Sequence, residues 1–476
     1  MRGVRGRDPA AVFVFWLLLP WVAVAEGAAV EIEAARRRFG SIEARVREAE
    51  TQLRAVERRI ASQQALLESA ALAEGRGDAS GLAGFWQRVH VGGWLSASYL
   101  YSLNDPDDAA NCADVLGAPS GSRSECGFAA GGLANTLRGA SGRLGLISPD
   151  HNSFSFEQAW LELEHAATEE HRGGFRIDWA YGKTAGLAWS EGVANRSEAR
   201  DDTGFYIFQT YAQYLLPFGF GGEDTLLKAG AFYTHIGVEA LQTVWNWNIT
   251  RSNVWSLMEP SNHLGVQASG AIGESGFDWM FGVVNGFWLD DPDRNDGKTL
   301  TAHLGWTGET VAVSANAIWG PEQLGFDGDQ SGVAHLLLRW DPTERFATYL
   351  SADYGWAETA GDPWGIGVAW AARLALTDRT GIAVRADWAH DGDRYFGLRN
   401  ERGEPTDAHV WSLTATLDHR LTSHFMLRGE LRWDAITKED GPDGEFFRGK
   451  RYRRGLDDDQ VLVAVEAIYH FNGFGN

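Results

Sequence analysis

The chain has 476 residues and a formal net charge of -22, and so strong an acidic balance argues against nucleic acid as a partner. Beyond residue 25, no stretch approaches the roughly 18 consecutive apolar residues of a membrane-spanning helix, which argues against a helical membrane protein. Phe, Trp and Tyr make up 12% of the residues, and 57 glycines stand against 13 prolines. That composition suits the interfacial aromatic girdles and tight turns of a β-barrel.

The first 25 residues are predicted to be a secretory signal peptide. Three arginines among the first seven residues precede an apolar core at residues 11–19, and Ala23-Val24-Ala25 has the small-x-small pattern of a cleavage site. An uncleaved anchor helix is the alternative, although the apolar run is too short to span a membrane well. We therefore expect a protein that is exported by a Gram-negative bacterium.

An apolar heptad repeat in residues 28–72 predicts an α-helical coiled coil. The first core position of the repeat recurs every seven residues, at Ile32, Phe39, Val46, Leu53, Ile60 and Leu67, and a second core position follows each of these by three residues. Because so narrow an apolar seam needs another helix to cover it, the repeat predicts oligomerisation without fixing the number of chains. Residues 73–84 are rich in Gly, Ser and Ala and form the expected linker.

Residues 85–476 repeat one pattern, in which runs of roughly ten residues alternate apolar with polar side chains and end at a turn signal. In the first run, Val91 and Leu95 share one face, whereas Ser96 and Ser98 share the other. Runs of this length suit tilted strands that cross a bilayer. The predicted fold class is therefore all-β, a transmembrane antiparallel β-barrel of about sixteen strands in the outer membrane, preceded by the α-helical coiled coil.

The predicted connections alternate between short and long, as the periplasmic turns and extracellular loops of a single-chain barrel do. Residues 237–261 and 321–331 are among those expected to be long extracellular loops. An even strand number places both ends of the barrel in the periplasm, together with the coiled coil. Acidic clusters at residues 105–108, 198–202, 290–296 and 457–459 fall in predicted loops. They either bridge through divalent cations to lipopolysaccharide or merely keep the loops soluble.

The chain has two cysteines, Cys112 and Cys126, and both fall in one predicted loop rich in Gly, Asp and Ser. In an exported protein, a close pair of cysteines predicts a disulfide bond, which would stabilise the fold by about 3 kcal/mol in the chain-entropy model. A metal site is not expected there, because neither a histidine nor a third cysteine flanks the pair.

The alternation also places charged side chains on the inner face of the barrel wall. An arginine at the membrane midplane of the lipid face would cost about 2–4 kcal/mol, which favours the inward assignment. These charges either form a constriction with a modest anion preference, or pair across strands and fill the lumen. The predicted pore-lining residues are Arg88, His90, Arg176, Asp178, Lys228, Arg373, Arg385, Asp387, Arg428, Glu430, Arg432, Asp434 and Glu466.

Residues typical of enzyme active sites are not arranged in any motif that we recognise. The sequence contains no G-x-S-x-G elbow, no H-E-x-x-H and no phosphate-binding loop, so we expect neither an enzyme nor a bound cofactor. Trp245 and Trp247 alternate with Asn246 and Asn248. These tryptophans could stack on sugars, but a place in an interfacial girdle is the commoner role for such residues.

The last predicted strand places Val461, Val463, Val465, Ala467, Tyr469 and Phe471 on one face. Its aromatic end resembles the C-terminal signal that the outer-membrane assembly machinery reads, although residues 472–476 trail behind it. In the order and spacing of its parts, the sequence resembles the β-barrel porins of the OmpL-like type. Besides this last strand, the resemblance rests on residues 150–159, 174–178, 228–230, 237–239, 284–286 and 295–298.

The resemblance implies a passive diffusion channel for small hydrophilic solutes. The N-terminal heptads are also similar to those of trimeric outer-membrane porins with a periplasmic helical stalk, which implies a homotrimer. The expected partners are outer-membrane lipid and lipopolysaccharide, with peptidoglycan as a further candidate. A different class of function stays open, in which the barrel is a non-conducting anchor and the coiled coil tethers the outer membrane to the cell wall.

Overall fold

The structure is a computed structural model that describes residues 86, 88–103, 152–187, 204–287, 293, 295–323, 325–359, 361–393, 395–396, 407–440, 447–448, 456–457 and 459–474. The chain divides into two units, Met1–Gln87 and Arg88–Asn476, and nearly all described residues belong to the second. The predicted signal peptide, coiled coil and linker lie outside the described residues, and so do both cysteines. Among the described residues, no helix is both long and apolar enough to cross a membrane.

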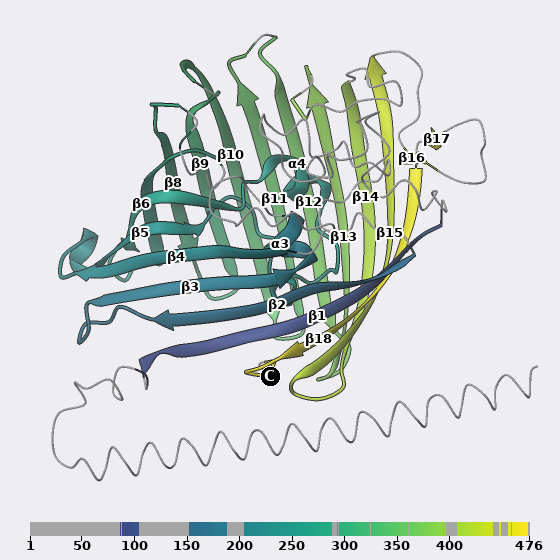
Figure 1. The fold of residues 1–476 in the computed structure, drawn as a ribbon, viewed down its shortest axis with the longest axis horizontal. Helices are drawn as coiled ribbons and strands as arrows, with labels where there is room; N and C mark the ends of the chain where they lie inside the picture. Colours follow the sequence, from purple (N-terminus) through teal and green to yellow (C-terminus); the bar gives the residue numbers. More distant parts are fainter. Residues whose placement is uncertain are drawn as a thin grey trace, which may run out of the picture. The chain divides into compact units, whose positions relative to one another are not determined.

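Sixteen antiparallel strands close into a barrel (Figure 1). Neighbours in the chain are neighbours in the wall, and β18 closes the ring by pairing with both β15 and β1. The strands are β1 (His90–Ser102), β2 (Ser153–His165), β3 (Gly173–Gly182), β4 (Gly204–Leu216), β5 (Thr225–Tyr233), β6 (Asn262–Ala271), β7 (Phe277–Val284), β8 (Thr299–Thr307), β9 (Val311–Gln323), β10 (Phe326–Thr343), β11 (Phe346–Ala357), β12 (Trp364–Ala375), β13 (Thr380–Gly392), β14 (Asp407–Arg420), β15 (Phe425–Asp440) and β18 (Asp459–His470). A separate pair, β16 (Phe447–Arg448) and β17 (Leu456–Asp457), forms a two-stranded sheet.

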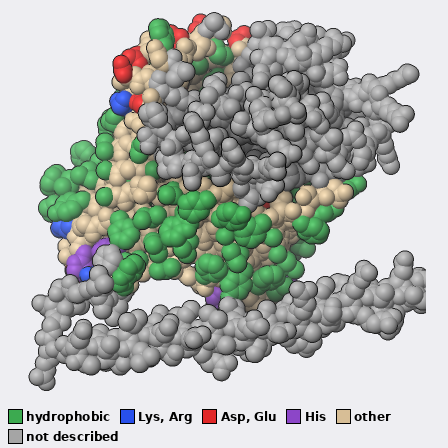
Figure 2. Space-filling model, viewed as in Figure 1, with side chains coloured by type: hydrophobic (Ala, Val, Ile, Leu, Met, Phe, Trp, Pro, Cys, Tyr) green, Lys and Arg blue, Asp and Glu red, His purple; other side chains and the backbone are tan. Residues whose placement is uncertain are grey.

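The alternation of the sequence separates an apolar outer face from a polar inner face, as predicted. On β15, Leu427 and Leu431 are exposed on the outside, whereas Arg428 and Arg432, each the next residue along the strand, are buried on the inside. Figure 2 shows hydrophobic side chains gathered over the outward face of the strands at the front of the view, β1 to β4. Because hydrocarbon solvates such side chains and water does not, this outer face suits a bilayer.

The connection expected at residues 321–331 is a strand extension instead of a loop. Strands β9 and β10 continue through it, with Pro321 opposite Gln330 and Gln323 opposite Phe326. The prediction of a long loop there was wrong, because this stretch with its Gly and Asp residues forms paired strands. The two strands pair with each other, so their backbone groups are satisfied even where the hairpin extends beyond its neighbours.

The residues after β18 turn back onto the inner side of the wall. Phe471 is exposed on the outer face, and its backbone N–H donates to the carbonyl of Gly93 at 2.9 Å. The ring of Phe474, in contrast, lies 5.4 Å from that of His470 and packs against a cluster of inward aromatic side chains. Phe471 therefore holds the outward aromatic position that ends the strand, and Phe474 does not.

The largest departure from the sequence prediction is the connection between β5 and β6. Residues 234–261, which we call the luminal segment, fold inside the barrel and carry η5 (Thr243–Trp245) and α4 (Asn253–Met258). Every residue from 248 to 260 is buried. Helix α4 packs against β11 to β14, and the short helix α3 (Lys183–Leu187) packs against β2 to β4 (Figure 1). The connection is long, as predicted for residues 237–261, but it folds into the barrel and does not form an exposed extracellular loop.

Candidate functional site

Helix α4 is positioned by its cap and by small residues on the wall. The side chain of Ser252 accepts a hydrogen bond from the backbone N–H of Trp255 at 3.0 Å, which starts the helix. Val254 and Met258 lie against Gly367 of β12, where a Cβ would be 2.8 Å from both side chains. A glycine at this inward position therefore lets the helix approach the wall closely.

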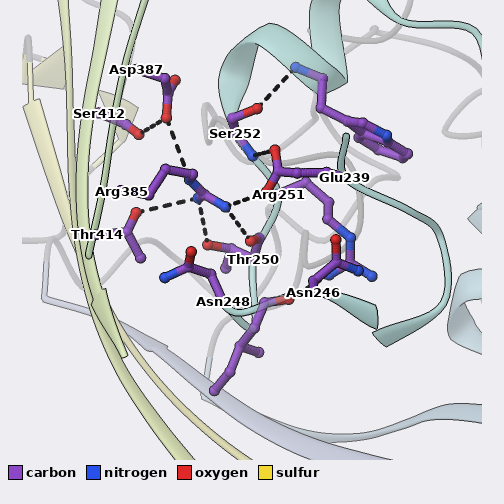
Figure 3. A network of polar contacts seen from close by, with 12 residues as sticks. Glu239, Asn246, Asn248, Thr250, Arg251, Ser252, Arg385, Asp387, Ser412 and Thr414 are labelled. Carbon is purple, nitrogen blue, oxygen red and sulfur yellow. Dashed lines mark hydrogen bonds and ion pairs between the residues drawn. The ribbon is translucent and has the colours of Figure 1, made fainter. Parts of the chain in front are cut away.

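Arg385 on β13 forms hydrogen bonds to the middle of the luminal segment (Figure 3). Its Nη1 donates to the carbonyl of Thr250 at 2.6 Å and to Glu239 Oε1 at 2.6 Å, and its Nη2 donates to Thr414 Oγ1 at 3.2 Å. Its Nε lies 3.6 Å from Asp387 Oδ2. The guanidinium is fully buried, and a buried charge of this kind is tolerated only with such partners.

Glu430 on β15 accepts four hydrogen bonds around one turn of the segment. Its carboxylate receives the backbone N–H of Ile249 at 2.6 Å and of Thr250 at 3.1 Å. It also receives the hydroxyls of Thr250 at 2.6 Å and Thr416 at 2.7 Å. A single wall carboxylate thus satisfies backbone donors of the segment that would otherwise be buried without partners.

Arg428 and Glu466 form a second anchor, between β15 and β18. Arg428 Nε donates to Glu466 Oε2 at 2.8 Å, and its Nη1 donates to the carbonyl of Asn246 at 2.8 Å. Glu466 Oε1 accepts from the hydroxyl of Thr243 at 2.7 Å. The two wall residues pair with each other across strands and hold the luminal segment at the same time.

Arg432, Asp434 and Asp387 hold the start of α4 through Asn253. Arg432 donates to Asp434 Oδ1 at 2.7 Å through Nη2, which also donates to Asn253 Oδ1 at 2.8 Å. The Asn253 side chain donates to Asp434 at 3.1 Å, and its backbone N–H donates to Asp387 Oδ1 at 2.9 Å. Arg432 also donates to the carbonyl of Arg251. The helix N-terminus is therefore tied to β13 and β15.

Arg251 stabilises the luminal segment through hydrogen bonds inside the segment. Its guanidinium donates to three backbone carbonyls of the segment itself, those of Ala240 at 2.6 Å, Leu241 at 2.9 Å and Ile249 at 2.7 Å. Burial lowers the pKa of Arg251 to about 10, which still leaves the side chain charged at neutral pH. These bonds join the two halves of the segment to each other without using any residue of the wall.

The predicted residues on β3 are inward but form a separate cluster. Arg176 donates to Asp178 Oδ1 at 2.8 Å and pairs with Glu162 and Glu164, each at 3.1 Å. Asp178 is fully buried and also accepts from Gln209 at 2.7 Å. This cluster is a set of mutually paired charges on neighbouring strands, and the luminal segment contributes none of these contacts.

Two further predicted residues also stand apart from the luminal segment. Lys228 Nζ lies 4.8 Å from the centroid of the Tyr211 ring. Arg373 on β12 donates to both carboxylate oxygens of Asp418 on β14, at 2.9 and 3.0 Å. Their inward placement agrees with the alternation, and whether they line a pore stays a prediction.

The two remaining predicted residues lie at the edge of the wall. Arg88 precedes the first strand and is exposed, so it is not part of a strand face. His90 begins β1, is also exposed, and lies 3.4 Å from the side-chain amide of Asn472. The structure therefore places neither of them beside the luminal segment.

Sequence reasoning missed the luminal segment as a functional element. Trp247 lies against Tyr349 on the inner face of β11, with ring centroids 5.3 Å apart, so the expectation of an interfacial position was wrong for this residue. A usable signal was present, because residues 240–258 contain no Asp or Glu and several apolar residues, whereas the predicted extracellular loops contain acidic clusters. Gln158, whose side chain binds Leu241 and Thr243, carried no comparable signal.

Comparisons with known proteins agree with the barrel. The family model described as "Putative beta-barrel porin-2, OmpL-like" matches residues 88–471. No curated protein sequence matches the chain.

Similar solved structures are also outer-membrane proteins. The outer membrane channel DcaP of Acinetobacter baumannii is 10% identical over 80% of this chain and 97% of that chain, with a TM-score of 0.49. An anion-selective porin from Comamonas acidovorans is 10% identical over 80% of this chain and 99% of that chain, with a TM-score of 0.48. Pseudomonas putida OprB is 9% identical over 82% of this chain and 96% of that chain, with a TM-score of 0.48.

Proposed function

Since the chain belongs to the OmpL-like β-barrel porins and is an outer-membrane channel, we propose that small hydrophilic solutes diffuse through its barrel and that the luminal segment forms the constriction. The observation that supports this proposal is the placement of residues 234–261 inside a closed ring of strands. A segment fastened there narrows the path of a passing solute.

The anchors explain why so many charges lie on the inner face of the C-terminal strands. Arg385, Arg428 and Arg432 each contact a wall or segment carboxylate and at least one backbone carbonyl of the segment. They keep the constriction in one position, because releasing the segment would leave buried charges without partners. Their role in this proposal is to position the constriction rather than to contact the solute.

Single-channel recording in planar bilayers tests the constriction with a matched pair of variants. Glu430→Gln weakens the bonds to the backbone of Ile249 and Thr250, so we expect a higher open-channel conductance and more frequent current transitions. Asp418→Asn removes an inner-wall carboxylate on the neighbouring strand β14. This carboxylate binds Arg373 and not the luminal segment, so we expect a wild-type current trace. Equal traces from all three proteins would contradict the role of the luminal segment.

A modest anion preference is the finer part of the proposal. The arginines of the anchors are already balanced by Glu239, Asp434 and Glu466, so any preference would be weak. The reversal potential in a salt gradient measures it, and a clear cation preference would refute it.

The competing function is a non-conducting anchor, and one observation favours it. Aromatic and aliphatic side chains form a cluster inside the barrel that includes Trp94, Trp160, Phe208, Leu241 and Trp255, which reduces the room for solutes. A steady open current in the bilayer experiment would support the channel, and silence at all voltages would support the anchor. Nothing in the described lumen suggests catalysis, and we propose no enzymatic activity.

For the rest of the chain we propose the arrangement that the sequence predicts. Residues 1–25 would be removed on export, and residues 28–72 would form a periplasmic coiled coil, followed by the linker at residues 73–84. The barrel would contact outer-membrane lipid and lipopolysaccharide, with a Cys112–Cys126 disulfide in an extracellular loop. The mass of the native protein, measured with and without residues 28–72, tests whether the coiled coil makes a trimer. Co-sedimentation with peptidoglycan tests the cell-wall contact.

A further inference from the structure

Three potential metal ligands meet where the luminal segment returns to the wall. Glu259 lies one residue after α4, and His335 of β10 is directly opposite Asp353 of β11 in the strand register. One ligand atom from each of the three residues lies within 4.8 Å of the others. All three side chains are buried, with 5%, 1% and 1% of their surface exposed, respectively.

The two carboxylates lack the donors that buried carboxylates normally have. Neither oxygen of Asp353 accepts a hydrogen bond from a described donor, and neither does Oε2 of Glu259. The two carboxyl groups instead lie within hydrogen-bonding range of each other. Two buried groups of like charge in contact are unfavourable unless a cation or a shared proton lies between them. The Arg385 guanidinium is not available, because Glu239 and Thr250 occupy it.

The neighbouring residues hold the three side chains in position. His335 contacts the side-chain amide of Asn316 through Nδ1 at 2.7 Å and the hydroxyl of Ser351 through Nε2 at 2.9 Å. Both ring nitrogens therefore have partners, so a metal ion would have to replace one of these contacts, while the other would keep the imidazole oriented. The Glu259 carboxylate lies against Gly237, where a Cβ would be 1.6 Å from Oε2. No other amino acid would fit at position 237 with Glu259 in this place.

We propose that Glu259, His335 and Asp353 bind one divalent transition-metal ion of the Zn²⁺ class. Imidazole together with two carboxylates is a donor set that suits Zn²⁺ and its first-row neighbours better than Ca²⁺ or Mg²⁺, which prefer oxygen ligands alone. A bound ion would join the end of the luminal segment to β10 and β11. It would fasten the segment four to five strands around the ring from the β15 anchors.

Metal binding is measured on the full-length protein, folded in detergent and stripped with a chelator. Equilibrium dialysis against Zn²⁺, followed by elemental analysis, should give one tight Zn²⁺ per chain in the wild type. Asp353→Asn and His335→Gln should each weaken this binding by about tenfold or more. Asp418→Asn is the matched control, because Asp418 is an inner-wall carboxylate that binds Arg373 at 2.9 Å and lies outside the proposed site. We expect wild-type binding from this control.

The visible absorption of added Co²⁺ provides a second measurement that needs only the wild-type protein. A four-coordinate site of nitrogen and oxygen ligands should give visible bands much stronger than those of aqueous Co²⁺, and Zn²⁺ should abolish them. Absence of tight Zn²⁺ binding, or binding that both site variants retain, would overturn the proposal and leave a proton shared by the two carboxyl groups. Preference for Ca²⁺ over Zn²⁺ would also overturn it. These outcomes report on the metal site whether or not the barrel conducts.

Discussion

At the scale of single residues, the charged side chains on the inner wall mainly bind other parts of the same chain. Arg432 illustrates this, because it pairs with Asp434 two positions along β15 and also reaches Arg251 and Asn253 of the luminal segment. Arg339 and Asp341 on β10 form an ion pair of the same spacing at 2.8 Å, but these side chains are 47% and 40% exposed. Among the described residues, the only other polar or ring contact of the Arg339 side chain is with the Trp247 ring, whose centroid is 5.9 Å from the guanidinium. Burial and the number of partners, rather than the pair itself, distinguish the two sites.

Arg432→Met should destabilise the barrel by about 3–5 kcal/mol, because it leaves Asp434 buried without its cation. Arg339→Met changes the same residue type in an exposed pair and should cost no more than about 1 kcal/mol. Urea unfolding in lipid vesicles, followed by tryptophan fluorescence, measures both. Adding Asp434→Leu to Arg432→Met should recover part of the loss. Equal costs for the two single variants would mean that burial of the Arg432 pair does not matter.

At the scale of elements, α4 packs closely against β12 because the helix presents apolar side chains and the inner face of the strand carries small residues. Gly367 faces Val254 and Met258, and Ala369 continues the small inward face of the strand. Gly367→Val should displace the helix and destabilise the barrel by about 1–3 kcal/mol through overpacking. The same unfolding experiment measures the cost, and bilayer recordings should show a changed conductance.

The control for Gly367→Val is a similar change on the outer face. Ala415 on β14 is exposed towards the outside, so Ala415→Val adds apolar surface without meeting another side chain and should be close to neutral. If both variants behaved alike, the close approach of α4 to β12 would not be important for stability or conductance.

Strand faces could be predicted from the sequence, whereas the path of the luminal segment could not. A strand face depends on side chains two residues apart, as for Arg428, Glu430 and Arg432, so a local pattern reveals it. The luminal segment depends on partners far away in the chain, such as Glu430 for Ile249, and no local periodicity encodes such a pairing. The proposed metal site was missed for the same reason, because Glu259 is remote in sequence from His335 and Asp353.

At the scale of the whole molecule, the barrel and the luminal segment are separable in principle. The wall is closed by backbone hydrogen bonds of the strands, and the ends of β5 and β6 already lie side by side, with Tyr233 opposite Asn262. A short glycine-serine linker in place of residues 235–260 would therefore connect them as an ordinary hairpin.

We expect the protein with this replacement to fold into a barrel and to conduct more current than the wild type. Retarded or advanced migration of the unheated protein in detergent gels reports whether the barrel has formed, and planar-bilayer recording reports the conductance. A folded barrel whose conductance is unchanged would show that the luminal segment does not limit the flow of ions. Failure to fold would show that the segment is needed for assembly.

The sequence distance between the luminal segment and its anchors has a consequence for biogenesis. Ile249 meets Glu430 across 181 positions of the chain, and Thr243 meets Glu466 across 223. The segment is synthesised long before β15 and β18 exist, and closing such long loops is entropically slow. Its buried polar groups find their partners only once β15 and β18 are in place. We therefore expect the width of the channel to be fixed late in folding.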